Sequence, residues 1–189
     1  YGASTDEGNG VNCYPTCEYV FFLNECASDE ACIPTRGSDW DDGGRYRELQ
    51  HHSWTPNNQC VLAGWRYAFT GVSKVNAIIY QVDQSSLSDE GKNKVKAELR
   101  GLRAYYYWLL LDQFGNVPIC TDFTQKELPA NSPRKEVYAF VENEINDILP
   151  YLPTGVQYGR MTQNVAYTLL ARLYLNAEVY TGTPQWQKC

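Results

Sequence analysis

Apolar side chains recur at every third or fourth position along most of this chain, and that spacing restricts the fold to packed helices. The pattern runs through residues 61–84, 89–114, 133–152 and 163–180. An α-helix repeats about every 3.6 residues, so each stretch presents one apolar face that another element must cover. No alternating stretch with a clear partner strand is found. The sequence therefore predicts an all-α fold.

Capping residues and helix breakers indicate where these helices begin and end. Ser88 and Thr162 are expected to cap the second and fourth helices. Ser132 is expected to cap the third, with Pro133 at its first helical position, where proline is best tolerated. The helices then pair into two successive hairpins. Helical hairpins in series indicate tetratricopeptide-like repeats.

The two hairpins are expected to pack side by side, because a single hairpin would leave its apolar faces in water. Gly71, inside the first helix, either weakens that helix or admits a close neighbour. Arginines at 100, 103, 160 and 172 are interpreted as structural, with Glu98, Glu144 or Asp147 as partners. The residues expected to form the shared core are Leu99, Leu102, Tyr106, Phe140, Ile145, Ile148, Leu169 and Leu173.

Residues 28–57, called the recognition loop below, lack helical periodicity. They place tryptophans, arginines and acidic residues among glycines and prolines. Flat aromatic faces, rigid turns and planar polar groups are suited to binding a polar, ring-shaped ligand. Trp40, Tyr46 and Trp54 are therefore candidates for stacking on sugar rings, and Asn57 lies three residues after Trp54. The alternative is that the tryptophans anchor the loop, which is the favoured role for Trp40.

The charge of the chain limits the classes of ligand. The chain has 16 basic and 22 acidic residues, a net charge of −6. A nucleic-acid or anionic-lipid surface needs clustered positive charge, so both are disfavoured. No apolar run approaches the roughly 18 residues of a transmembrane helix. A neutral or weakly charged ligand is compatible with this composition.

Several polar clusters were considered as catalytic or metal sites. Asp39, Asp41 and Asp42 are interpreted chiefly as turn-capping residues, with calcium binding or catalysis as alternatives. His51 and His52 are adjacent, so their side chains diverge, and one is expected to bond a backbone carbonyl. No nucleophile motif such as GxSxG is present. We therefore expect no enzymatic activity, no metal site and no cofactor.

The cysteines are concentrated near the amino terminus. The chain has 7 cysteines, and Cys13, Cys17, Cys26 and Cys32 lie within its first 32 residues. At least one disulfide is expected among these four, with Cys26–Cys32 or Cys13–Cys17 favoured. A zinc site and free thiols are the alternatives, although the spacing lacks the tight CxxC of most structural zinc sites.

Several motifs resemble those of the SusD/RagB family of outer-membrane glycan-capture lipoproteins. In the recognition loop they are SDE at 28–30, PTRG at 34–37, DWDDGG at 39–44 and the block at 47–56. Tyr46 stands where the family frequently has tryptophan. Further along, the similar segments are AELRGLRAYYY at 97–107, FGNVP at 114–118, YGRMT at 158–162 and ARLYL at 171–175.

The resemblance implies a glycan-binding protein built on helical repeats. It implies glycan contacts through Arg36, Trp54 and Asn57, and non-catalytic delivery of oligosaccharide to a SusC-like TonB-dependent transporter. It also implies a lipid anchor, absent from this chain, that holds the protein at the outer-membrane cell surface. On this interpretation the chain is the amino-terminal portion of a longer protein. It would form one structural domain, with a cysteine-rich segment and recognition loop over residues 1–60 and helical hairpins over 61–189.

Two other functions are considered. A tetratricopeptide-type scaffold would bind a peptide or protein in its concave groove, and Trp54 would be dispensable for binding. A glycoside hydrolase would turn over a polysaccharide. The first is the preferred alternative, because the sequence has no acid–base or nucleophile signature.

Overall fold

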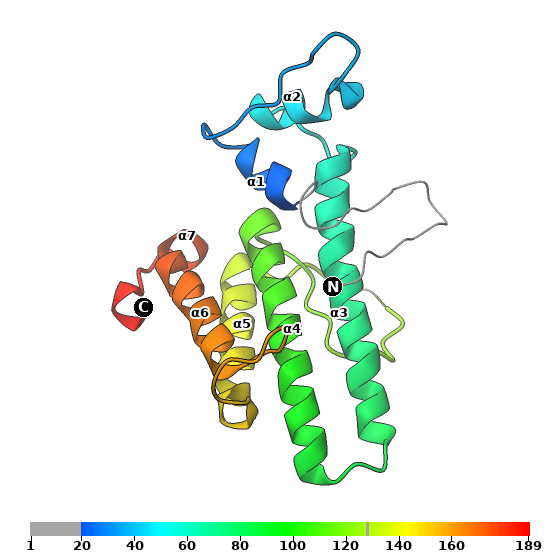
Figure 1. The fold of residues 1–189 in the computed structure, drawn as a ribbon, viewed down its shortest axis with the longest axis vertical. Helices are drawn as coiled ribbons and strands as arrows, with labels where there is room; N and C mark the ends of the chain where they lie inside the picture. Colours follow the sequence, from blue (N-terminus) through cyan, green and yellow to red (C-terminus); the bar gives the residue numbers. More distant parts are fainter. Residues whose placement is uncertain (1–19, 128) are drawn as a thin grey trace. The chain divides into compact units, whose positions relative to one another are not determined.

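A computed structural model describes residues 20–127 and 129–189, and its regular structure is helical (Figure 1). Two isolated β-bridges, Arg36 with Asp39 and Val117 with Ser132, are the only strand-like pairings in these two ranges. The predicted all-α class is thereby confirmed. The helices are α1 (Phe22–Glu25), α2 (Arg45–Gln50), α3 (Gln59–Gln84), α4 (Asp89–Phe114), α5 (Arg134–Ile148), α6 (Gln163–Leu175) and α7 (Ala177–Thr181), with 3-10 turns η2 (Asp42–Gly44), η3 (Leu149–Tyr151) and η4 (Trp186–Lys188).

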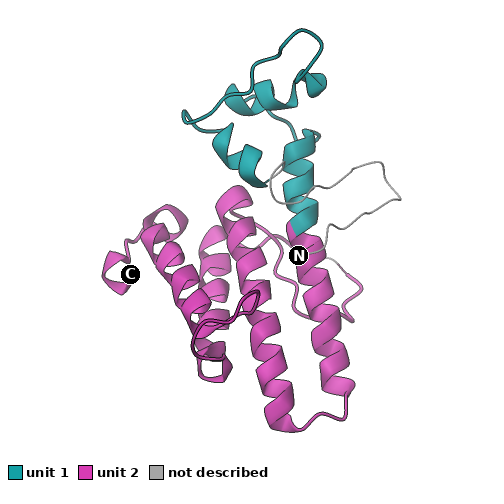
Figure 2. Cartoon of the chain, viewed as in Figure 1, with its two compact units in different colours: residues 1–67 teal, residues 68–189 magenta. Residues whose placement is uncertain are grey.

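The chain divides into two compact units, residues 1–67 and residues 68–189 (Figure 2). The division falls inside α3. The first unit holds the recognition loop and the second holds the helical hairpins. No described helix combines the length and the apolar composition needed to cross a bilayer.

The first unit has a small core of its own that orders the recognition loop. Cys26, Tyr46, Leu49, Cys60 and Ala63 are buried together. Tyr46 and Leu49 come from α2, and Cys60 and Ala63 come from the first turns of α3. The partly buried residues packed against this cluster are Phe22, Leu23, Ile33 and Val61.

In the second unit α4 is the central helix. It packs chiefly against α5 and also contacts α6. Residues 68–84 of α3 run along its other side (Figure 1). Gly71 makes this approach possible, because a Cβ added there would lie 2.4 Å from the Tyr106 ring. Gly71 therefore admits a close neighbour, as one of its two interpretations required.

The eight predicted core residues are all covered, but to different degrees. Ile145, Ile148, Leu169 and Leu173 are buried. The other four, Leu99, Leu102, Tyr106 and Phe140, are half-buried, and none of the eight is exposed.

The most buried residues of α4 are not the three predicted from it, Leu99, Leu102 and Tyr106, which are half-buried. Val95, at the same helical spacing, is 39% exposed. The buried residues include three small residues and one arginine as well as large apolar side chains, because α4 has neighbours on more than one side. The buried residues of α4 are Ala97, Gly101, Arg103, Ala104, Tyr107, Leu109, Leu110 and Leu111.

Two predicted helix starts are confirmed and one is wrong. The side chain of Ser88 accepts a hydrogen bond from Gly91 N, and that of Thr162 accepts one from Val165 N. At α5 the helix begins at Arg134, after Pro133, and Ser132 does not cap it. Asn116 takes that role from the preceding loop, because its Oδ1 accepts a 2.7 Å hydrogen bond from Arg134 N.

The helix predicted over residues 163–180 is interrupted. It is two helices in the structure, α6 and α7, separated at Asn176. Asn176 has left the helical region, with φ of −98° and ψ of 9°, and its side chain donates to Arg172 O at 3.3 Å. An asparagine that bonds locally to the backbone competes with helix propagation, which accounts for the break.

A polar network ties the helices of the second unit together. Glu144 of α5 is buried and accepts from Arg103 Nη2 and Arg100 Nη2, both at 2.7 Å. Arg103 also donates to Asn76 of α3 at 2.8 Å, and Arg100 reaches Asp147 at 2.9 Å. These bonds confirm the structural interpretation of Arg100 and Arg103.

Candidate functional site

Two of the predicted binding residues line one hollow in the first unit. The hollow has a volume of about 240 Å³, and Arg36 and Trp40 are part of its wall. Both side chains belong to exposed residues, and Trp40 is 44% exposed. The remaining lining residues are Phe22, Cys32, Ile33 and Pro34.

A tight turn brings Arg36 and Trp40 close together. Arg36 and Asp39 exchange two backbone hydrogen bonds of 2.9 Å, and Gly37 between them has φ of +63°. Asp39 then accepts from Trp40 N at 3.1 Å, while Trp40 itself has φ of +58°. A tryptophan rarely occupies this left-handed region. The backbone of Trp40 is therefore strained, and the surrounding contacts must maintain its conformation.

Tyr46 does not present its ring to a ligand. It is 2% exposed and belongs to the core of the first unit. Its ring lies 5.4 Å from that of Phe22, and the Arg45 guanidinium lies 4.8 Å above it. Its expected stacking role is therefore wrong in this structure, because neighbouring side chains cover the ring.

Trp54 and Asn57 occupy an exposed turn before α3. Trp54 is 41% exposed, and its ring lies 5.3 Å from that of His52. Nε2 of His52 is 2.8 Å from Ala27 O, which confirms that one histidine bonds a backbone carbonyl. The side chain of Asn57 makes no hydrogen bond with any residue that the structure describes, so its amide can meet a ligand.

The residue that holds this turn was missed by sequence reasoning. Asn58 is 4% exposed, and its Nδ2 donates to Glu48 Oε2 at 2.7 Å. Its Oδ1 accepts from Cys60 N at 3.0 Å and from Val61 N, which caps α3. The signal was an asparagine, a preferred N-cap residue, three residues before the predicted start of the helix at residue 61.

The three aspartates of DWDDGG each have a nearby partner. Asp39 caps the turn at Trp40, Asp41 pairs with Arg47 at 2.8 Å, and Asp42 lies 3.4 Å from Arg45. Over residues 20–127 and 129–189, no three His, Cys, Asp or Glu side chains are grouped to hold a metal ion. These contacts are those of a loop stabilised by local turns and ion pairs.

The predicted Cys26–Cys32 disulfide is wrong, because both residues are free thiols. Cys26 is buried in the core of the first unit, and burial raises the pKa of its thiol. Cys32 is exposed and lines the hollow. The side chains of Cys26 and Cys32 therefore lie in different environments. Cys13 and Cys17 lie outside the described residues.

Comparison with known proteins identifies the family. Residues 25–175 match a SusD-like family described as starch-binding and associating with outer membrane. The starch-binding protein SusD of Bacteroides thetaiotaomicron is 33% identical over 173 residues, which cover 89% of this chain and 30% of the relative. A SusD-like protein of Bacteroides ovatus is 27% identical over 148 residues, or 74% of this chain and 27% of the relative. The chain thus spans less than a third of the length of these relatives.

Solved structures share the fold. A SusD superfamily protein from Bacteroides vulgatus superposes with a TM-score of 0.74 at 18% identity, covering 90% of this chain and 36% of its own. Surface glycan-binding protein A from Bacteroides uniformis gives 0.73 at 22% identity, covering 85% and 37%. A laminarin-binding SusD-like protein gives 0.71 at 24% identity, covering 85% and 35%.

Three of these relatives are named as binding proteins, and the family match over residues 25–175 includes both the recognition loop and most of the helical repeats. The chain therefore belongs to the SusD-like family, which is described as starch-binding and associating with outer membrane.

Proposed function

We propose that this chain is the recognition portion of a non-catalytic protein that captures a neutral oligosaccharide. The observation that carries the proposal is the pair of half-exposed tryptophans, Trp40 and Trp54, on a loop with a small core of its own. An indole covers the apolar face of a pyranose, while Arg36 and the amide of Asn57 reach its hydroxyl edge. The family description and the names of its relatives support a glycan as the ligand.

The four exposed residues have separate parts in this proposal. Arg36 and Trp40 line the hollow, and Trp54 and Asn57 lie on the turn before α3. Tyr46 supports the loop from beneath, because it is buried. Binding is non-covalent, and no catalytic group is assigned.

The proposal extends to the location and the partner of the protein. The proposed protein is held at the cell surface by an amino-terminal lipid anchor and delivers oligosaccharide to a SusC-like TonB-dependent transporter. The family's description as associating with outer membrane supports this placement. Copurification of the tagged full-length protein with a TonB-dependent transporter from outer membranes tests the partnership.

Replacement of Trp54 by alanine tests the proposed ligand site. Loss of an aromatic ring that the bound sugar would cover should weaken binding of maltoheptaose or laminarihexaose by about 1–3 kcal/mol, roughly 5- to 150-fold. Isothermal titration calorimetry on the full-length protein measures this change. The matched control is Tyr167→Ala, which removes an exposed aromatic ring, 54% exposed, from α6.

The proposal fails if Trp54→Ala binds both sugars as tightly as the unaltered protein, with the same melting temperature. Release of reducing sugar above a buffer control would contradict the non-catalytic assignment. Binding of a peptide at the helical repeats, with neither sugar bound, would favour the scaffold function instead.

A further inference from the structure

We propose that the second unit carries a separate groove that binds a neutral oligosaccharide. The groove has a volume of about 1020 Å³ and lies between the first half of α4 and the segment from η3 to Gln163. That volume is at the upper end of the range for ligand pockets. The residues that matter for recognition are Asn93, Glu98, Tyr151, Gln157 and Arg160.

The wall opposite α4 is a closed loop with fixed ends. Gln163 N donates to Pro153 O at 3.0 Å, and Gln163 Nε2 donates to Leu149 O at 3.0 Å. Met161 is buried against α4 at Gly101, where an added Cβ would lie 2.6 Å from Met161 Cγ. The groove is therefore formed before a ligand arrives, which reduces the entropy cost of binding.

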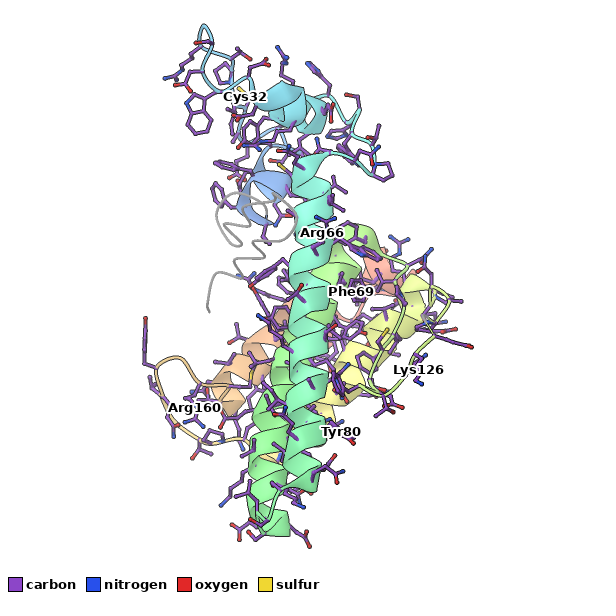
Figure 3. All side chains as sticks on the ribbon, turned by 90° about the vertical axis from the view of Figure 1, so that its right-hand side faces the viewer. Cys32, Arg66, Phe69, Tyr80, Lys126 and Arg160 are labelled. Carbon is purple, nitrogen blue, oxygen red and sulfur yellow. The ribbon has the colours of Figure 1, made fainter. Side chains whose placement is uncertain are left out.

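An ion pair joins this loop to α4. Arg160 Nε donates to Glu98 Oε2 at 2.8 Å, and a second bond forms between Arg160 Nη2 and Glu98 Oε1. Figure 3 shows Arg160 projecting from the loop that borders the groove. The bidentate arrangement holds the guanidinium of Arg160 and the carboxylate of Glu98 in place on the groove wall, where both can contact a polar ligand.

The charges along the groove cancel. Besides Glu98 and Arg160, the charged lining residues are Glu90 and Lys94, which pair at 2.6 Å. Two acidic and two basic side chains, each with a partner, leave no net charge to attract a phosphate, a metal ion or an acidic polymer. A neutral polar ligand matches this lining.

The groove also offers an aromatic face and unoccupied amides. Tyr151 is 50% exposed. Asn93 and Gln157 are exposed, and their side chains form no hydrogen bond with any residue in the described ranges. A tyrosine ring that covers the apolar face of a pyranose, with amides reaching its hydroxyls, is the arrangement a neutral oligosaccharide needs.

This groove is distinct from the proposed ligand site, because none of its lining residues belongs to the first unit. The choice of sugar as probe rests on the proposed function.

Nuclear magnetic resonance of the 15N-labelled full-length protein tests the proposal. Titration with maltoheptaose and, separately, laminarihexaose should shift the side-chain amide signals of Asn93 and Gln157 in a saturable manner. The shifts should persist in Trp54→Ala. Tyr151→Ala should raise the apparent Kd at these two amides about tenfold, whereas Tyr167→Ala should leave it unchanged.

The outcomes separate this proposal from the proposed function. Shifts at Trp54 and Asn57 without shifts at Asn93 and Gln157, for both sugars, overturn the groove and sustain the first site. Shifts at the groove alone sustain the groove and overturn the first site. Saturable groove shifts with an uncharged pentapeptide, but with neither sugar, would show a peptide site and overturn the proposal. If Tyr151→Ala loses helical circular dichroism, Gln157→Ala gives the comparison at the remaining amide, that of Asn93.

Discussion

Glu144 is a buried carboxylate that joins two arginines in the interior of the second unit. Its exposure is 6%, and each carboxylate oxygen accepts from a different arginine. Arg103 is equally buried, at 6%. A buried carboxylate tolerates its loss of hydration only when its lone pairs are occupied, as they are here.

Removal of the Glu144 carboxylate should therefore destabilise the protein strongly. Glu144→Ala leaves the buried Arg103 charge without its main partner, and we expect a loss of about 3–5 kcal/mol in unfolding free energy. The control is Asp147→Ala, which removes an exposed partner of Arg100 and should cost less than about 1 kcal/mol. Urea denaturation followed by circular dichroism measures both, and equal small losses would contradict a central role for Glu144.

For single residues, the sequence predicted the partners of charged side chains better than it predicted which aromatic rings are exposed to a ligand. The pairing of Arg100 and Arg103 with Glu144 could be predicted, because helix periodicity already placed these residues on neighbouring helices. The difference between Tyr46 and Trp54 could not. Both are aromatic residues in one irregular loop, and only the packing of Phe22 and Arg45 on Tyr46 shows which ring is covered.

Helix α5 shows how an element can begin with help from a distant residue. Asn116 lies 18 residues before Arg134 in the chain, and its side chain satisfies the first backbone N–H of the helix. The bridge between Val117 and Ser132 holds the two segments together, with Ser132 N donating to Val117 O at 2.9 Å. Sequence reasoning considered only the local cap Ser132, because capping patterns describe neighbours in sequence.

Asn116→Ala should remove this cap and lower the unfolding free energy by about 1 kcal/mol, the usual cost of a lost helix cap. Ser132→Ala should have little effect, because its hydroxyl bonds no residue within the described ranges. Thermal unfolding of the two variants side by side gives the comparison. A larger loss for Ser132→Ala would restore the prediction made from sequence.

The bounds of α3 and α4 were predictable to within two residues, because apolar residues recur at helical spacing along most of each helix and Ser88 marks the start of α4. The orientation of α4 was not. Its buried Ala97, Gly101 and Ala104 have too little apolar surface to identify a buried face from the sequence. Their small side chains instead allow neighbouring helices to approach α4 closely. A central helix that is covered on more than one side does not show a single apolar stripe in its sequence.

For the whole molecule, the buried tyrosines set the response to alkaline pH. Burial is the largest cause that raises the pKa of Tyr107, Tyr138, Tyr174 and Tyr180 above the ordinary value of 10.0. Their hydroxyls therefore stay protonated in the folded protein at a pH where the unfolded chain has begun to ionise. This contribution to stability is fully present below pH 10 and is lost as the pH rises toward the folded-state pKa values.

We accordingly expect the melting temperature to be insensitive to pH between about 7 and 9 as far as these tyrosines are concerned, and to fall steadily above about pH 10. Tyrosinate absorbance at 295 nm should rise in two stages, with the second coinciding with the loss of helical circular dichroism. Reversible ionisation of all 15 tyrosines near pH 10 in the folded protein would contradict this expectation.

At the scale of the molecule, the fold class and the family could be predicted from sequence, whereas a boundary between two units inside α3 could not. The division falls within the continuous helix α3, whose apolar pattern gives no sign of it. The groove beside Tyr151 also escaped sequence reasoning. Its residues are ordinary polar side chains on α4 and after η3, and only the closure of the loop at Gln163 brings them together.

The Glu144 network has a further consequence, for the order in which the protein folds. Its bonds to Arg100 and Arg103 join residues 44 and 41 positions apart, whereas α3 and α4 are connected by only a few residues. Contacts between sequence neighbours close cheaply and early, and distant ones wait for the chain to be arranged. The network should thus form after the main barrier has been crossed. Loss of Glu144 would then leave the refolding rate nearly unchanged and accelerate unfolding. The carboxylate of Glu144 therefore contributes to the kinetic stability of the native protein.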